Sequence, residues 1–153
     1  MSTTIALPAV GSTMPDIPLT SESGASAHLA DVIAGSRSVI FFMRSASCAI
    51  CLGHVQSLTS MAAAGALDGA RVVVVVPGGA AEAARVATRV PAGTATVYAS
   101  GDEHASVGLG KFLVLQHSGT FVVDANGSIL SVRAAAVPTN SFSRDEVLSA
   151  LAD

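Results

Sequence analysis

The chain holds two cysteines, Cys48 and Cys51, in the order Cys-Ala-Ile-Cys. In a chain with few charged residues, a lone close pair of cysteines is rarely a structural disulfide framework. In this spacing the first cysteine typically reacts as a thiolate nucleophile. The second lies one helical turn further on, so its sulfur can reach the first. The pair therefore predicts a redox site, in which Cys48 attacks an oxidised substrate and Cys51 resolves the product to an internal disulfide.

The flanking residues place this pair between a strand and a helix. Ser38 to Met43 is a mostly apolar run, typical of a central strand that is covered on both faces. From Cys48 to about Ala64, apolar residues recur at spacings of three and four, which predicts a helix. Free backbone N–H groups and the helix dipole at the start of that helix favour a thiolate over a thiol. Arg44, four residues before Cys48, is placed to add a positive charge.

Two other interpretations of the pair stay open. The cysteines could be buried and inert, or they could bind a metal, because Cys48, Cys51 and His54 recur every three residues. A tetrahedral zinc site usually draws on two separated ligand pairs, and the chain has no second cysteine pair. We therefore expect no metal and no cofactor. The remaining histidines are scattered, and His117 stands directly before a predicted strand.

The rest of the chain alternates between strand and helix patterns. The proline-rich first twenty residues predict an extended arm that leads to a short edge strand or hairpin. A strand, helix, strand order implies parallel central strands with right-handed crossovers, and Asn126-Gly127 predicts an antiparallel hairpin at one edge. We therefore predict a single α/β domain over residues 1–153, with a central mixed sheet flanked by helices. Strands are expected at Ser38–Met43, Val72–Val76, Thr94–Ala99, Thr120–Asp124 and Ser128–Val132, helices at Cys48–Ala64, Ala80–Val90 and Ser143–Leu151, and single helical turns at His28–Ile33 and Asp102–Val107.

Composition excludes several classes of protein. Half of the 153 residues are hydrophobic and 12% are charged, which excludes a disordered chain. The eight basic residues are scattered singly, so we expect no nucleic-acid partner. The mean hydropathy is +0.59, yet the longest uncharged stretch, Ser45 to Leu67, is too polar to span a membrane. Residues 1–10 hold no Lys or Arg, so we expect no secretory leader, no membrane association and a cytoplasmic location.

Three longer motifs resemble a known family. The segment Gly11-Ser-Thr-Met-Pro-Asp-Ile-Pro-Leu19 looks like the opening of peroxiredoxins. The segment Val39-Ile-Phe-Phe-Met-Arg-Ser-Ala-Ser-Cys-Ala-Ile-Cys51 is similar to their strand-to-helix site, and Thr120-Phe-Val-Val-Asp-Ala-Asn-Gly-Ser-Ile129 looks like their edge hairpin. Together these motifs resemble the peroxiredoxin-like branch of the thioredoxin-fold superfamily, the alkyl hydroperoxide reductase/thiol-specific antioxidant group. The resemblance covers nearly the whole chain and implies a thioredoxin-like fold with an N-terminal extension or hairpin.

The sequence also departs from the family's peroxidase members at two places. They carry a proline seven residues before the reactive cysteine, where this chain has Phe41. They carry an arginine shortly before the hairpin phenylalanine, where this chain reads His117-Ser-Gly119. A serine or threonine three residues before the cysteine is matched by Ser45. Ser45 and Arg44 are therefore candidates to stabilise the thiolate and a bound peroxide. That Arg44 replaces the missing arginine is a hypothesis that rests on its spacing from Cys48 alone.

The function expected from these motifs is thiol-dependent and antioxidant, with peroxide as the substrate, Cys48 as the nucleophile and Cys51 as the resolving thiol. One alternative is a thioredoxin-like reductase of protein disulfides, and another is a non-enzymatic redox-sensing or binding module. The expected partners are a peroxide or disulfide substrate and a thiol reductant, either a thioredoxin-type protein or a low-molecular-weight thiol. A second copy of the chain, in a homodimer, is a further candidate partner.

Overall fold

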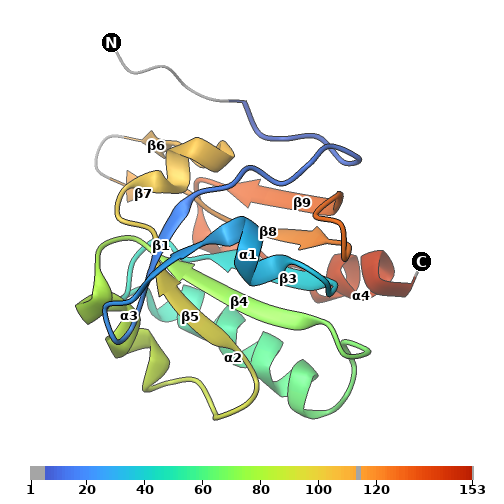
Figure 1. The fold of residues 1–153 in the computed structure, drawn as a ribbon, viewed down its shortest axis with the longest axis horizontal. Helices are drawn as coiled ribbons and strands as arrows, with labels where there is room; N and C mark the ends of the chain where they lie inside the picture. The colour runs from blue at the N-terminus through green and yellow to red at the C-terminus, as the bar shows by residue number, and fades with distance from the viewer. Residues whose placement is uncertain (1–5, 113–114, 153) are drawn as a thin grey trace.

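The computed structural model describes residues 6–112 and 115–152. Its main feature is a seven-stranded mixed sheet in the order β2-β1-β5-β4-β3-β8-β9 (Figure 1). The strands are β1 Pro18–Ser21, β2 Ser26–His28, β3 Ser38–Phe42, β4 Arg71–Val76, β5 Thr96–Ala99, β8 Ser118–Val123 and β9 Ile129–Ala135. The helices are α1 Leu29–Ile33, α2 Ala49–Ala63, α3 Ala80–Ala87 and α4 Arg144–Ala152, with short 3-10 helices η1 Glu103–Val107 and η2 Pro138–Asn140. A separate pair is formed by β6 Lys111–Phe112 and β7 Leu115–Gln116.

The topology confirms the predicted α/β fold with a mixed sheet. Strands β3, β4 and β5 run parallel, whereas β8 is antiparallel to β3 and β9 is antiparallel to β8. The β1–β2 hairpin extends the other edge through β5. The strand expected to begin at Thr120 begins at Ser118, because Ser118 and Gly119 pair through their backbones with Ala135 and Ala134. Backbone pairing does not require an apolar side chain, so the hydrophobic pattern missed these two residues.

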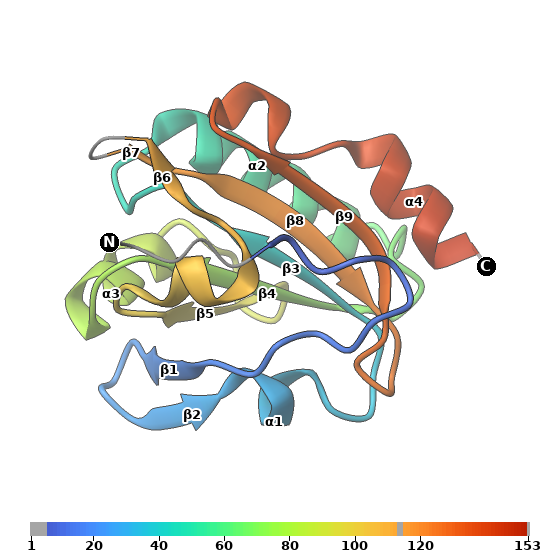
Figure 2. The ribbon, with the colours of Figure 1, turned by 90° about the horizontal axis from the view of Figure 1, so that it is seen from above.

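The apolar runs of the central strands are buried on both faces of the sheet. Val39 and Phe41 of β3 pack in one core with α2, α3 and α4, whereas Ile40 and Phe42 pack in a second core with the N-terminal arm, α1 and η1. Figure 2 shows α1 on one side of the strands and α2 with α4 on the other. Alternate residues of a strand face opposite sides, so a strand between two cores needs a continuous apolar run. This arrangement accounts for the high hydropathy. Within the described ranges, no helix is long and apolar enough to cross a membrane.

The fold brings three chain segments to the carboxyl end of β3. Phe42 at the end of β3 pairs with Gly119 near the start of β8, so the segment before β8 lies beside Met43. The neighbouring strand β4 ends beside the loop that contains Ser100 and Gly101. The cysteines follow β3 at this end of the sheet, where ligand sites of open α/β sheets commonly lie.

Candidate active site

Cys48 is the N-cap residue of α2. Its backbone is extended, with φ −72° and ψ 105°, and its Sγ accepts a hydrogen bond from the backbone N–H of Cys51 at 3.2 Å. The sulfur thus satisfies one of the backbone donors that a helix leaves free in its first turn. Cys48 and Cys51 are 4% and 0% exposed, and both are free thiols. The structure therefore brings the two predicted redox residues together at the strand-to-helix turn.

Cys51 has a different electrostatic environment from an exposed thiol. Burial raises the pKa of Cys51 to about 12, and the hydrogen bond to the Cys48 side chain acts in the same direction. The backbone N–H of Arg44 donates to Cys51 Sγ at 3.4 Å and opposes this rise in pKa. Cys51 therefore keeps its proton at neutral pH.

Arg44 and Ser45 form the turn between β3 and α2. The side chain of Arg44 is half-buried, and its guanidinium has no ion-pair partner in the described part of the chain. The carbonyl of Ser45 accepts the backbone N–H of Cys48 at 3.3 Å, and its hydroxyl lies 3.4 Å from the hydroxyl of Ser47. Among the described residues, the Ser45 hydroxyl makes no hydrogen bond to either sulfur. The contact of Ser45 with Cys48 is made by the backbone.

The charge of Arg44 can be tested separately from its backbone contact. Arg44→Ala removes the guanidinium and keeps the N–H that donates to Cys51. We expect Cys48 to react with iodoacetamide about three-fold more slowly at pH 7, because a nearby positive charge favours negative charge on a sulfur. The rate is followed by mass spectrometry, with the exposed Arg144 replaced by alanine as the control. An unchanged alkylation rate would remove the Arg44 guanidinium from the site.

His54 does not extend the cysteine pair into a metal site. Its Nε2 lies 2.8 Å from the carbonyl oxygen of Pro138, and its ring packs against Phe41 and Phe142. Residues 6–112 and 115–152 contain no group of three or more His, Cys, Asp or Glu side chains arranged to hold a metal ion. His54 thus anchors η2 to α2.

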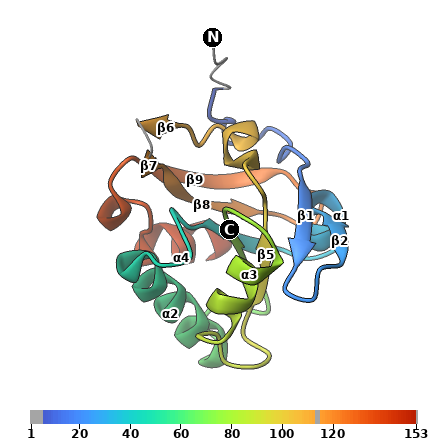
Figure 3. The same cartoon turned by 90° about the vertical axis from the view of Figure 1, so that its left-hand side faces the viewer.

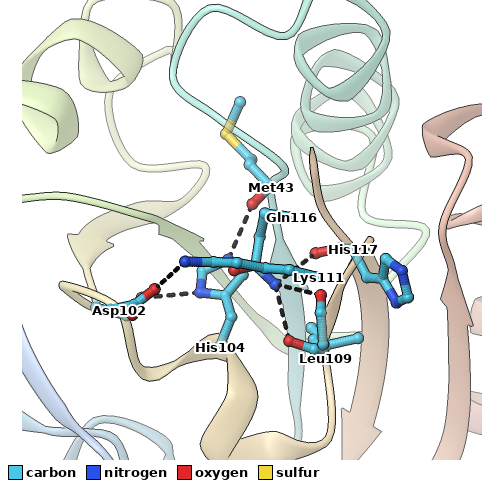
Figure 4. Close-up of polar contacts among 9 residues, drawn as sticks. Met43, Asp102, His104, Leu109, Lys111, Gln116 and His117 are labelled. Atoms are coloured by element: carbon cyan, nitrogen blue, oxygen red, sulfur yellow. Dashed lines mark hydrogen bonds and ion pairs between the residues drawn. The ribbon is translucent and has the colours of Figure 1, made fainter. Parts of the chain in front are cut away.

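His104 also lies at the site, although no pattern in the sequence predicted a role for it there. Its side chain is fully buried against Phe42, with ring centroids 5.0 Å apart. Nε2 is 2.9 Å from the carbonyl oxygen of Met43 (Figure 4). Nδ1 is 2.8 Å from the hydroxyl of Ser100. A carbonyl only accepts, so Nε2 carries the proton and Nδ1 accepts from Ser100. Burial lowers the pKa of His104 to about 4, so the ring is neutral at pH 7.

This histidine is connected to the cysteines through the backbone. The Met43 carbonyl that His104 holds belongs to the same peptide unit as the Arg44 N–H, and that N–H donates to Cys51 Sγ. His104 therefore fixes the orientation of a peptide that contacts the buried sulfur. No local motif could have indicated this role, because η1 reaches β3 only through the tertiary fold.

The segment before β8 is held by Gln116. Its side-chain amide donates to the carbonyl of Leu109 at 2.8 Å (Figure 4). The same amide donates to the carbonyl of Gly110 at 2.9 Å, and the backbone N–H of His117 also donates to Gly110. The Nε2 atom of His117 and the hydroxyl of Ser118 are buried without a hydrogen-bond partner in the described residues. Gln116 thus orders the loop at which the family's arginine was expected.

Comparison with known proteins identifies the family of this chain. The Redoxin family model matches residues 9–151. The chain belongs to the Redoxin family. A search of curated protein sequences finds no match. Membership in Redoxin confirms the resemblance drawn from the three motifs and makes the chain a thiol oxidoreductase by class.

Solved structures support the same thioredoxin-like fold for this redoxin. A peroxiredoxin-like protein from Aquifex aeolicus superposes with a TM-score of 0.81 at 17% identity, covering 97% of this chain and 89% of the other. Prx3 from Vibrio vulnificus, solved with hydrogen peroxide, gives 0.77 at 20% identity, covering 95% and 99%. A chain assigned as the thiol:disulfide interchange protein DsbE from Chlorobium tepidum gives 0.69 at 24%, covering 95% and 99%. At these identities the likeness establishes the fold.

Proposed function

We propose that this redoxin reduces peroxides, with Cys48 as the nucleophile and Cys51 as the resolving thiol. The observation that carries the proposal is that the two sulfurs lie in different environments. Cys48 Sγ accepts the N–H of Cys51 at the start of α2, a position that stabilises negative charge. Cys51 is buried and remains a protonated thiol. One sulfur is thus placed to attack, and the other to supply a thiol and a proton afterwards.

The reaction proceeds in two balanced steps. The Cys48 thiolate attacks one peroxide oxygen, the O–O bond breaks, and the departing alkoxide or hydroxide takes up a proton, which leaves Cys48 as a sulfenic acid. Cys51 then attacks the Cys48 sulfur, the S–O bond breaks, and the thiol proton of Cys51 leaves with the hydroxide as water. The peroxide gains two electrons, and the two thiols become one disulfide. The guanidinium of Arg44 stabilises negative charge on the sulfur and on the departing oxygen.

The burial of Cys48 favours a small substrate. Only 4% of the residue is exposed, so a peroxide of few atoms reaches the sulfur more readily than the disulfide of a folded protein. The second candidate function is protein disulfide reduction, which the helix-capping Cys-X-X-Cys pair itself supports. A redox-sensing module without turnover is the third.

A side-by-side assay separates these three functions. Purified protein is given hydrogen peroxide with dithiothreitol in one reaction, and insulin with dithiothreitol in another. We expect catalytic peroxide consumption and little acceleration of insulin reduction. Faster insulin reduction without peroxide turnover would establish the disulfide reductase instead. A single stoichiometric oxidation of the cysteine pair, with no cycling, would establish the sensing module.

A further inference from the structure

A hollow in the surface lies directly beside the cysteine turn. It has a volume of about 480 Å³ and is bounded by the turn before α2 and by α3. Ser47 and Ala49, the two neighbours of Cys48 in the chain, line one side of it. Leu52 contributes an apolar surface from the next turn of α2. Figure 3 shows α3 next to the turn that leads into α2. A molecule bound in this hollow therefore lies beside the turn that carries the nucleophile proposed above.

The opposite side of the hollow is positively charged. Arg85 of α3 lines it together with Thr88 and Arg89, which lie in the turn that follows this helix. Both arginines are exposed, and neither guanidinium has an ion-pair or hydrogen-bond partner within residues 6–112 and 115–152. No acidic residue lines the hollow.

The acid nearest in sequence on α3 is held elsewhere. A Cβ atom on Gly78 would lie only 2.6 Å from Oε1 of Glu82, so this carboxylate rests over the turn that begins the helix. A negative charge at the amino end of a helix is stabilised there by the free N–H groups. Arg85 and Arg89 thus remain available, although the net charge of the whole chain is −3. The hollow is suited to an anionic ligand.

We propose that this hollow binds the carboxylates of a small anionic thiol, and that this thiol reduces the Cys48–Cys51 disulfide. The inference rests on the proposed function, because it assumes that the two cysteines form a disulfide during turnover. Guanidinium groups bind carboxylates with paired hydrogen bonds, and two of them lining the same hollow suit a ligand with two carboxylates. The volume is in the range of small-molecule sites and fits a ligand of tripeptide size.

The reduction takes two thiols for each disulfide. The thiolate of the bound ligand attacks Cys48 Sγ, the S–S bond breaks, and Cys51 leaves and takes up a proton. A second ligand thiolate then attacks the ligand sulfur of the mixed disulfide, which releases Cys48 as a thiolate. Two ligand thiols are oxidised to one disulfide, and the protein pair is reduced by two electrons.

The test measures reduction of the isolated disulfide. The protein is oxidised with diamide, so the measurement does not depend on peroxide chemistry. Reduction is then followed with glutathione, which carries two carboxylates, and with neutral 2-mercaptoethanol. For the double variant R85A/R89A we expect about a ten-fold slower reaction with glutathione, because the loss of charge reduces local attraction. The rate with 2-mercaptoethanol should change less than two-fold.

Controls distinguish charge from structure. R85K/R89K keeps the charge and should retain most of the glutathione rate, whereas R144A on α4 should change neither rate. High salt should lower the wild-type glutathione rate toward that of R85A/R89A. An equal loss with both thiols, or no loss with either, would overturn the proposal. If R85A/R89A slowed reduction by a thioredoxin-type protein alone, the hollow would be a protein-docking surface and the small-thiol proposal would be wrong. Failure of the diamide-oxidised protein to form the disulfide would instead refute the proposed function.

Discussion

Replacement of Cys48 by serine is expected to lower peroxide turnover by at least about a thousand-fold, because a serine hydroxyl is not ionised at neutral pH and is a weak nucleophile. Replacement of Cys51 by serine should leave the first oxidation intact. In Cys51→Ser, Cys48 is then expected to accumulate as a sulfenic acid, since the buried thiol that resolves it is missing. Intact mass spectrometry after one equivalent of hydrogen peroxide measures this product as a gain of one oxygen.

The two cysteine variants also test each other. Serine is close in size to cysteine, so both variants should fold, and circular dichroism verifies this. Loss of the first oxidation in Cys51→Ser, with normal oxidation in Cys48→Ser, would show that the roles of the two sulfurs are reversed. Equal first oxidation in both variants would show that neither environment selects the nucleophile.

The stability of the protein is expected to fall between pH 6.5 and pH 4 because of His104. Its folded pKa is lowered from 6.5 to about 4 by burial, so the unfolded chain binds a proton in this range that the folded chain does not. The contribution of neutral His104 to the free energy of unfolding is complete above pH 6.5 and is lost progressively as the pH falls toward 4. The difference in pKa corresponds to a loss of about 3 kcal/mol in the free energy of unfolding. Nearby Asp102 opposes the lowering of the pKa, and Lys111 supports it to a smaller extent.

His104→Gln isolates this contribution. The variant should lose about 1–3 kcal/mol at pH 7, because buried hydrogen bonds to Met43 and Ser100 are disturbed. Its unfolding free energy should then change less than the wild type's between pH 7 and pH 4.5, as measured by urea denaturation. His28→Gln, at a largely exposed histidine, is the control. A parallel pH dependence in wild type and His104→Gln would contradict a buried, neutral histidine.

The fold followed from the sequence because each core strand carries its own signal. The five valines of β4 and the apolar run of β3 are continuous since both faces of these strands are buried. The Asn126-Gly127 turn predicted the β8–β9 hairpin, and the structure has that hairpin. The cysteine pair was also visible, because its chemistry depends on residues adjacent in the chain.

Other parts of the site depend on contacts between distant segments. His104 meets Met43 only because η1 packs beneath the end of β3, and no spacing in the sequence encodes that contact. The expectation that the Ser45 side chain stabilises the thiolate has no counterpart in the hydrogen bonds, where the Ser45 carbonyl is the group that contacts Cys48. The hollow beside α3 likewise arises from the packing of two helices.

The rate at which Cys48 reacts with hydrogen peroxide tests the central proposal most directly. Fully reduced protein is mixed with peroxide under second-order conditions, and oxidation is followed by intact mass, with Cys48→Ser as the blank. We expect a rate constant at least about a hundred-fold above that of a free thiol at the same pH, the gain that placed hydrogen-bond donors and charges typically supply. A rate constant no larger than that of a free thiol would contradict a peroxide-reducing function.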